Sequence, residues 1–300
     1  MPVGTSRHRT LQGRELCPRP LTIVVMRVAI VAMRRSATVL LALFLAGCTT
    51  NAIRIDRLAG TLGMSRSVVE AGGFRSLVFT RGLPAVQAAP LAIFLEGDGV
   101  PWLGGREPSL DPTTGDPIAL KLLAQTPPPA AYVTRPCYND MSGRRCTPER
   151  WTMERYSDEI VSSMAEAVRA AALQAKARSV VLVGYSGGGV LAVLIAERLD
   201  NVVAVVTVGA NLDIDSWTRH HGYLPLTGSL NPAASTAEHR WPETHLYGAR
   251  DEKVPPATAD AYFGRFPSAQ RQIVEGNDHV CCWVEQWPEL WKRLSATSLR

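Results

Sequence analysis

The run from Val180 to Gly189 constrains the fold and chemistry of this chain more than any other feature. Its first part, Val180–Val183, has no polar face, which is typical of a parallel strand covered on both sides. Gly184, Ser186 and Gly188 then fit the pattern G-x-S-x-G, in which a strand turns sharply into a helix and exposes the serine hydroxyl. A side chain at either glycine would collide with the turn or with a neighbouring strand. We therefore predict that Ser186 is a nucleophile.

A glycine-rich turn that cradles a phosphate is the alternative interpretation of the same run. Loops of that kind carry the spacing G-x-G-x-x-G, or a Lys followed by Ser or Thr, because they hold phosphates with backbone N–H groups and the lysine. The run has neither feature. Nucleophilic catalysis is the stronger interpretation.

A serine needs a base and an acid to become an effective nucleophile. Asp251 follows the apolar run 244–248, and His279 follows the run 272–276, so each is expected on a loop just past a strand. His279 would take the proton of Ser186 and return it to the leaving group. Asp251 would orient the imidazole and balance its charge. A surface loop histidine is the alternative for His279.

Strands and helices alternate along the chain, which indicates an α/β fold with a mostly parallel sheet. A helix is expected at 283–294, and about 250 residues suit a single domain. Six buried strands are predicted, at 91–95, 131–134, 180–183, 202–208, 244–247 and 271–275.

From about Leu77 to Leu294, the strand order, the serine turn and the two loops resemble the alpha/beta-hydrolase superfamily. The resemblance implies a mostly parallel central sheet with helices on both faces and a small or absent lid. It also implies a serine hydrolase that acts on carboxylic esters through an acyl-enzyme intermediate, with no cofactor. The segment 211–242, where relatives insert a lid, is short and shows no clear amphipathic helix. We therefore expect an open site.

Other carboxylates compete with Asp251 for the role of the acid. Asp278 is adjacent to His279 and is poorly placed to orient the same ring, and Glu252 is expected to be solvated. Some members of the superfamily carry the acid after the preceding strand. Two further candidates lie there: Asp213 and Asp215.

The oxyanion hole is expected to use two backbone N–H groups, and the first belongs to Gly187, directly after the nucleophile. By analogy with the superfamily, the second comes from the loop at 96–99, where Glu-Gly-Asp-Gly replaces the customary His-Gly-x-Gly. We assign it to Asp98, with Gly99 as the alternative. Glu96 is expected to organise this loop by accepting backbone hydrogen bonds. The charge of Asp98 opposes an oxyanion unless it is paired, and three partners are available: Arg106, Arg135 and Arg144.

A signal peptide is predicted at 33–47, after an upstream segment at 1–32 for which we expect no fold. It contains two arginines, an apolar stretch at 37–45 and the order Leu-Ala-Gly-Cys, which ends at Cys48. The apolar stretch is too short to span a bilayer as a helix. The order resembles the lipobox of bacterial lipoproteins, which implies that Cys48 is lipidated, palmitate included, and becomes the first mature residue. An ordinary signal peptide or the start of a buried helix is the alternative.

Removal of residues 1–47 changes what the net charge of +5 means. Seven of the 32 basic residues and one of the 27 acidic residues lie there, so 25 basic and 26 acidic residues remain. That balance does not favour nucleic acid as a partner. Segment 48–75 is interpreted as a tether and entry, and 76–300 as the hydrolase domain. Because Thr49 replaces the Asp that commonly retains lipoproteins in the inner membrane, the resemblance implies a lipid anchor in the outer membrane, facing the periplasm.

Export would place the remaining cysteines in an oxidising compartment, where four of them allow three disulfide pairings. We favour Cys137 with Cys146, which leaves Cys281 with Cys282. The two alternatives would tie the first loop to the segment after His279. A metal site is not expected, because no C-x-x-C or histidine pair of ligand spacing accompanies these cysteines.

Three functional classes fit these residues besides ester hydrolysis. An acyltransferase of the cell envelope uses the same three side chains and differs only in keeping water from the acyl-enzyme. A peptidase also uses them. A non-catalytic lipoprotein that retains the fold for binding is the third, and the presence of all three side chains argues against it.

Overall fold

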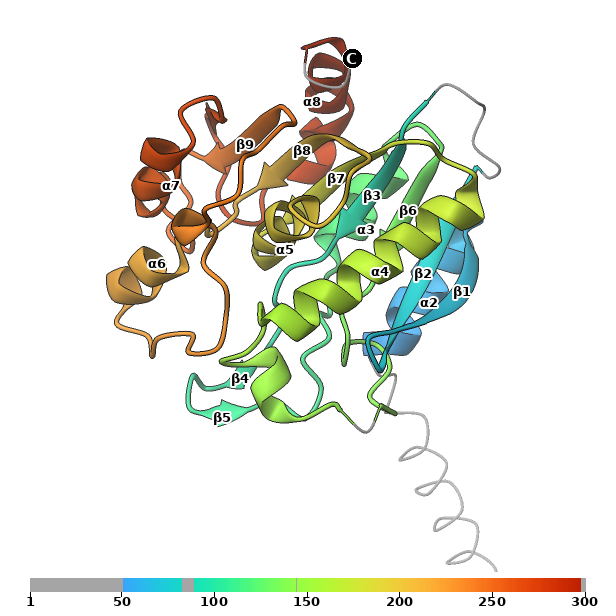
Figure 1. Ribbon diagram of the computed structural model, residues 1–300, viewed down its shortest axis with the longest axis horizontal. Helices are drawn as coiled ribbons and strands as arrows, with labels where there is room; N and C mark the ends of the chain where they lie inside the picture. The colour runs from blue at the N-terminus through green and yellow to red at the C-terminus, as the bar shows by residue number, and fades with distance from the viewer. Residues whose placement is uncertain (1–50, 83–88, 144, 298–300) are drawn as a thin grey trace, which may run out of the picture. The chain divides into compact units, whose positions relative to one another are not determined.

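The computed structural model describes residues 51–82, 89–143 and 145–297 (Figure 1). Its centre is a sheet of eight strands in the order β1-β2-β6-β3-β7-β8-β9-β10. The strands are β1 (Ser65–Ala71), β2 (Phe74–Arg81), β3 (Leu91–Leu95), β6 (Ala130–Val133), β7 (Val180–Tyr185), β8 (Val202–Val208), β9 (Glu243–Gly248) and β10 (Gln270–Val274). The pairs β1–β2 and β2–β6 are antiparallel and the other pairs of this sheet are parallel, so the sheet is mostly parallel, as predicted.

All six expected strands are present, and their ends shift by no more than two residues. The expectation that all six are buried is wrong for β10, which lies at the edge of the sheet and has no buried residue. The hairpin of β1 and β2 adds two strands that the sequence did not predict. In β1 only Val69 and Ala71 are buried, so its pattern of apolar residues is weak. This strand lies within the segment 48–75 that was interpreted as a tether and entry.

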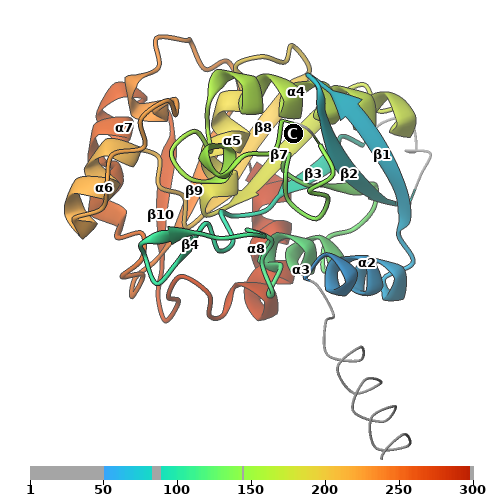
Figure 2. The same cartoon turned by 90° about the horizontal axis from the view of Figure 1, so that it is seen from below.

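Helices cover both faces of the sheet (Figure 2). On one face, α4 (Asp158–Ala175) and α5 (Gly187–Ala196) share a hydrophobic core with α7 (Asp260–Arg265). On the other face, a second core contains three helices: α2 (Asn51–Thr61), α3 (Ile118–Ala124) and α8 (Trp283–Thr297). The predicted helix at 283–294 is therefore present, and three residues longer. Every residue of α5 is buried, which is why this helix is apolar all round.

Three short helices and a hairpin complete the described part of the chain. The 3₁₀-helices are η1 (Pro148–Trp151), η2 (Pro232–Ala234) and η3 (Pro256–Ala259), and the hairpin joins β4 (Trp102–Leu103) to β5 (Glu107–Pro108). Within 51–82, 89–143 and 145–297, no helix has the length and apolar character needed to cross a bilayer. The predicted signal peptide and Cys48 lie outside the described residues.

The segment 211–242 corrects one expectation, because it does contain a helix, α6 (Ile214–His221). Asp213 caps it by accepting hydrogen bonds from the N–H groups of Asp215 and Ser216. Ile214 and Thr218 face inward and are buried, which gives the helix an apolar side. The pattern was missed because the helix has only eight residues. Between β8 and β9, where the resemblance places a lid, the described chain forms α6 and a 3₁₀-helix at Pro232–Ala234.

Candidate active site

Ser186 stands at the turn between β7 and α5 with φ +52° and ψ −126°, a backbone conformation that L-residues rarely adopt. The glycines around it leave no room for a side chain. A Cβ built on Gly184 would lie 2.2 Å from the carbonyl oxygen of Gly188, within the turn. A Cβ on Gly188 would lie 2.2 Å from the carbonyl oxygen of Leu95, on strand β3. This packing holds the serine above the end of the sheet.

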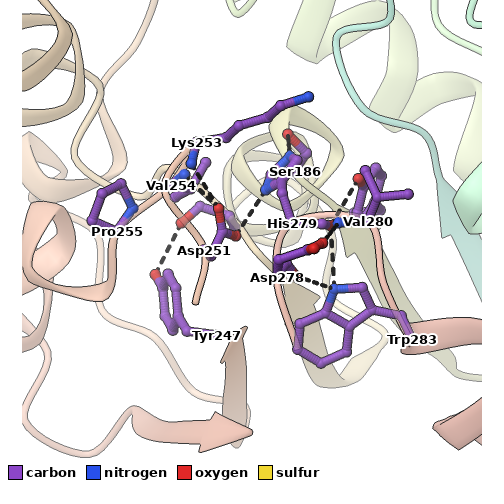
Figure 3. A network of polar contacts seen from close by, with 12 residues as sticks. Ser186, Tyr247, Asp251, Lys253, Val254, Pro255, Asp278, His279, Val280 and Trp283 are labelled. Atoms are coloured by element: carbon purple, nitrogen blue, oxygen red, sulfur yellow. Dashed lines mark hydrogen bonds and ion pairs between the residues drawn. The ribbon is translucent and has the colours of Figure 1, made fainter. Parts of the chain in front are cut away.

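The three side chains predicted to act together do meet (Figure 3). His279 Nε2 lies 3.1 Å from Ser186 Oγ, and His279 Nδ1 lies 2.8 Å from Asp251 Oδ2. The other carboxylate oxygen of Asp251 accepts hydrogen bonds from the N–H groups of Lys253 and Val254. The Asp251 side chain is fully buried, and 11% of the His279 side chain is exposed. This arrangement can pass a proton from the hydroxyl to the imidazole.

Parallel strands explain why residues so far apart in sequence converge. Ser186, Asp251 and His279 follow the carboxyl ends of β7, β9 and β10, which lie at one edge of the sheet. The acid loop and the histidine loop also bind each other, since Arg250 N–H donates to the carbonyl of Asn277 over 2.9 Å. The histidine's own backbone is held as well.

Two side chains hold that backbone, and the sequence did not single out either for this role. The Tyr185 hydroxyl and the Trp283 indole N–H donate to the carbonyl of His279, over 3.0 and 3.2 Å. Gly209 is a third residue that was missed, because a Cβ there would lie 3.2 Å from both His279 Nδ1 and Asp251 Oδ2. Its positive φ of +58° explains the glycine. A glycine directly after a buried strand was the available signal.

Three of the four competing carboxylates have other partners in the structure. Asp213 caps α6, and the side chain of Asn231 donates to both Asp213 and Asp215. Asp278 accepts the N–H groups of Cys281 and Val280, and these hydrogen bonds lower its pKa. Glu252 lines the cleft described below.

The two N–H groups assigned to the oxyanion hole belong to Gly187, which follows the nucleophile, and to Asp98, whose carboxylate lies against Gly187. Gly187 begins α5, so its N–H is at the positive end of that helix. Gly97 approaches Ser186 closely, since a Cβ there would lie 3.2 Å from Ser186 Cβ. Its N–H points instead to the Glu96 carboxylate, 3.2 Å away. In the described part of the chain, the N–H groups of Gly187 and Asp98 donate to no acceptor, so both are available to a ligand.

Glu96 lies beneath this loop and accepts hydrogen bonds, as the sequence led us to expect. Besides the N–H of Gly97, two further groups donate to Glu96. The N–H of Ala119 donates to Glu96 Oε2 over 3.1 Å, and the Tyr132 hydroxyl donates to the same oxygen over 3.3 Å. Burial raises the pKa of Glu96 to about 7, against the opposing effect of its backbone hydrogen bonds. The carboxyl group therefore changes its charge near neutral pH.

The Asp98 carboxylate is paired, and one of the three arginines considered is a partner. Arg135 Nη1 lies 2.5 Å from Oδ1, and Arg155 Nη1 lies 2.9 Å from Oδ2. Burial favours the neutral acid, but the guanidinium groups of Arg155 and Arg135 outweigh it and lower the pKa of Asp98 to about 2. Arg106 lines the cleft instead, and Arg144 lies outside the described residues. Arg155 was missed because no local pattern links it to a carboxylate 57 residues away.

A cleft of about 1090 Å³ opens above Ser186 and His279. Four aromatic residues line it: Trp102, Tyr185, Trp217 and Tyr223. His221 also lines it and stacks on Tyr223, with ring centroids 5.0 Å apart. Four exposed apolar side chains belong to its lining: Val100, Tyr223, Leu224 and Val280.

The cysteines adopt the pairing that we favoured. Cys137 binds Cys146, and Cys281 binds Cys282 directly after the histidine loop. Among the residues that the structure describes, no group of three His, Cys, Asp or Glu side chains could hold a metal ion.

No protein-family model and no curated protein matches the sequence. Solved structures do match, at low identity. Est1E from Butyrivibrio proteoclasticus is 14% identical with a TM-score of 0.52, over 78% of this chain and 98% of its own. An esterase from Pyrococcus furiosus is 12% identical with a TM-score of 0.57, over 80% and 93%. A proline iminopeptidase-related protein from Thermus thermophilus is 14% identical with a TM-score of 0.54, over 79% and 98%. These likenesses show that the chain has the alpha/beta-hydrolase fold.

Proposed function

We propose that the protein is a serine hydrolase of carboxylic esters, with Ser186, His279 and Asp251 as its catalytic residues. The observation that carries the proposal is the continuous pair of contacts from Ser186 Oγ to His279 to Asp251, at 3.1 and 2.8 Å. Both distances lie within hydrogen-bond reach, and the order of roles is that of a nucleophile, a base and an orienting acid. Est1E and the Pyrococcus furiosus esterase support it through the shared fold.

The reaction follows from this geometry. Ser186 Oγ attacks the ester carbonyl carbon while His279 Nε2 takes its proton, and the carbonyl oxygen becomes an oxyanion facing the N–H groups of Gly187 and Asp98. The tetrahedral intermediate collapses, the C–O bond to the alcohol breaks, and His279 returns the proton to the departing alkoxide. Water then attacks the acyl-enzyme in the same way and releases the acid and the free serine.

The cleft suits an apolar acyl group, because aromatic and aliphatic side chains line much of it. The short lid leaves water free to reach the acyl-enzyme, which favours hydrolysis over acyl transfer. We also propose that lipidated Cys48 anchors the enzyme to the cell envelope, with the outer membrane as its site. This part rests on the sequence from residue 33 to Cys48.

Substitution of the three catalytic residues tests the proposal. Ser186→Ala and His279→Ala should each lower the turnover of a short-chain p-nitrophenyl ester at least about a thousandfold, because neither attack nor proton transfer remains. Asp251→Asn should have a comparable effect, since the imidazole would lose its orienting carboxylate. A fluorophosphonate probe should label the wild type at Ser186 and should not label Ser186→Ala.

Asp213→Asn is the matched control, because Asp213 caps α6 and does not contact His279. It should keep ester turnover near that of the wild type. Full activity in Ser186→Ala, or labelling at another residue, would show that the enzyme proposal is wrong. If a second alcohol consumed the acyl group faster than water did, the protein would be an acyltransferase instead.

A further inference from the structure

Two buried arginines share a single carboxylate under the oxyanion loop. Arg135 and Arg155 bind opposite oxygens of Asp98, and only 1% and 4% of their side chains are exposed. The Tyr156 hydroxyl lies within 2.8 Å of both oxygens and donates to them without adding charge. Two positive charges therefore face one negative charge, and the cluster carries one surplus positive charge.

Asp98 is the one carboxylate among the described residues that binds either arginine. Glu96, the other acid of the loop, is bound by Gly97, Ala119 and Tyr132 and not by either arginine. The other hydrogen bonds of the two arginines go to uncharged backbone carbonyl groups. Arg155 donates to the carbonyl of Thr152, and Arg135 donates to the carbonyl of Arg155.

The cluster directly touches the backbone of the oxyanion hole. A Cβ built on Gly187 would lie 2.0 Å from Asp98 Oδ1 and 2.5 Å from the Tyr156 hydroxyl. Only a glycine therefore lets α5 begin against this carboxylate. Arg155 also lines the cleft, and its Nη2 donates to no acceptor among the described residues. The charged cluster therefore borders both the cleft and Gly187, whose N–H is assigned to the oxyanion hole.

A buried charge acts strongly on a nearby oxyanion because little water screens it. Fixed positive groups that are present before the reaction stabilise the charge of the transition state without the cost of reorganising. Asp98 alone would do the opposite, since its carboxylate would repel the oxyanion. With both arginines bound, the cluster is positively charged, whereas Asp98 alone would be negatively charged.

We propose that Arg135 and Arg155 are positioning residues of the oxyanion hole, which hold the Asp98 loop in place and make it electropositive through their surplus charge. This inference rests on the proposed function, because it requires an oxyanion to form beside Gly187. This role differs from the binding of an anionic group of the substrate. An arginine with that role would change substrate affinity, and only for charged substrates. The proposed role also differs from a purely structural ion pair, which would act on stability.

Arg155→Met and Arg155→Lys separate these roles with a neutral p-nitrophenyl ester as substrate. Methionine fills the space and leaves Asp98 paired with Arg135, whereas lysine retains the charge. We expect Arg155→Met to lower kcat about ten- to a hundredfold with KM within about threefold, and Arg155→Lys to recover most of the loss. Arg135→Met removes one positive charge from the same cluster and should lower kcat similarly. It therefore tests the inference if Arg155→Met does not fold.

Arg198→Met is the matched control, since Arg198 binds Asp158 on α4 and does not line the cleft. It should leave kcat unchanged. Three results would overturn the inference: unchanged kcat in folded Arg155→Met, equal losses with methionine and lysine, or a loss confined to KM or to anionic esters. The labelling rate of Ser186 by a fluorophosphonate separates the two proposals. A labelled wild type with an equal rate in Arg155→Met contradicts only this inference, and no labelling of the wild type contradicts both.

Discussion

At the residue scale, the immediate partners of single acidic side chains decide their charge in this site. Glu96 and Asp98 belong to the same loop; the first is buried, and 15% of the Asp98 side chain is exposed. Burial raises the pKa of Glu96 to about 7, because its partners are neutral N–H and hydroxyl groups. The pKa of Asp98 is lowered to about 2, because two guanidinium groups outweigh the same effect. Two neighbouring carboxyl groups therefore differ in charge near neutral pH.

Glu96→Gln should remove a pH dependence of stability. The pKa of Glu96 is about 7 in the folded chain, against 4.5 for an ordinary glutamate, so between these values the folded state holds a proton that the unfolded state has lost. The free energy of unfolding of the wild type should therefore fall as pH rises from about 4.5 to 7, by at most about 3 kcal/mol. Urea denaturation across this range measures it.

Glutamine cannot titrate, so the same profile should be flatter in the variant. Glu275→Gln is the control, since Glu275 is exposed and lies outside the site. A wild-type profile that rises with pH over this range, with Glu96→Gln parallel to it, would contradict the assignment.

At the scale of elements, the contact of α5 with β3 positions the nucleophile. The helix begins one residue after Ser186, and Gly188 lies against the carbonyl oxygen of Leu95. The sheet places the acid and histidine loops at the same edge. The backbone at Gly248, just before the acid loop, packs closely against the histidine loop. A Cβ on Gly248 would lie 2.6 Å from the carbonyl oxygen of Asn277.

Gly188→Ala should therefore displace α5 from the sheet. The new methyl group would overlap the backbone of β3, which cannot move without breaking its pairing with β7. We expect a loss of at least about 2 kcal/mol in the free energy of unfolding and a large loss of esterase activity. Thermal unfolding and ester turnover measure the two effects.

Gly264→Ala is the matched control, because it is also a helical glycine, on α7. Apart from its chain neighbours and the backbone of its own helix, no atom lies within 4 Å of the position that its new methyl group would take. It should be neutral or slightly stabilising, since alanine favours the helix. Equal stability of the two variants would show that the approach of α5 to β3 is not close.

At the scale of the whole molecule, the described residues form a sheet covered on both faces, and the predicted anchor precedes them. Residues 65–81 add the hairpin of β1 and β2 to the edge of this sheet. Asn51, the first of the described residues, is three positions after Cys48. In sequence, an anchor at Cys48 would thus be separated from the first described residue by Thr49 and Thr50.

Cys48→Ser should abolish lipidation of the full chain in a bacterial host with two membranes. Serine cannot form the thioether on which lipoprotein acylation depends, so incorporation of labelled palmitate should be lost and the protein should leave the membrane fraction. Cys17→Ser is the control and should keep both properties, because Cys17 precedes the predicted cleavage site. Palmitate incorporation by Cys48→Ser would show that the assignment is wrong.

The sequence by itself determined six of the eight strands of the sheet, the serine turn and the loops that carry Asp251 and His279. These features are local, because a buried strand followed by a polar loop is visible within a short stretch of sequence. The carboxyl ends of parallel strands lie at the same end of a sheet. Loops that follow such strands are therefore predicted to bring their side chains together there.

Only the tertiary structure decided the partners of those residues. Arg155 reaches Asp98 across 57 positions, and Gly209 borders His279 from another strand. The choice among three disulfide pairings was also decided there. Such contacts depend on how loops pack against each other at a sheet edge, and no periodicity along the chain records that packing.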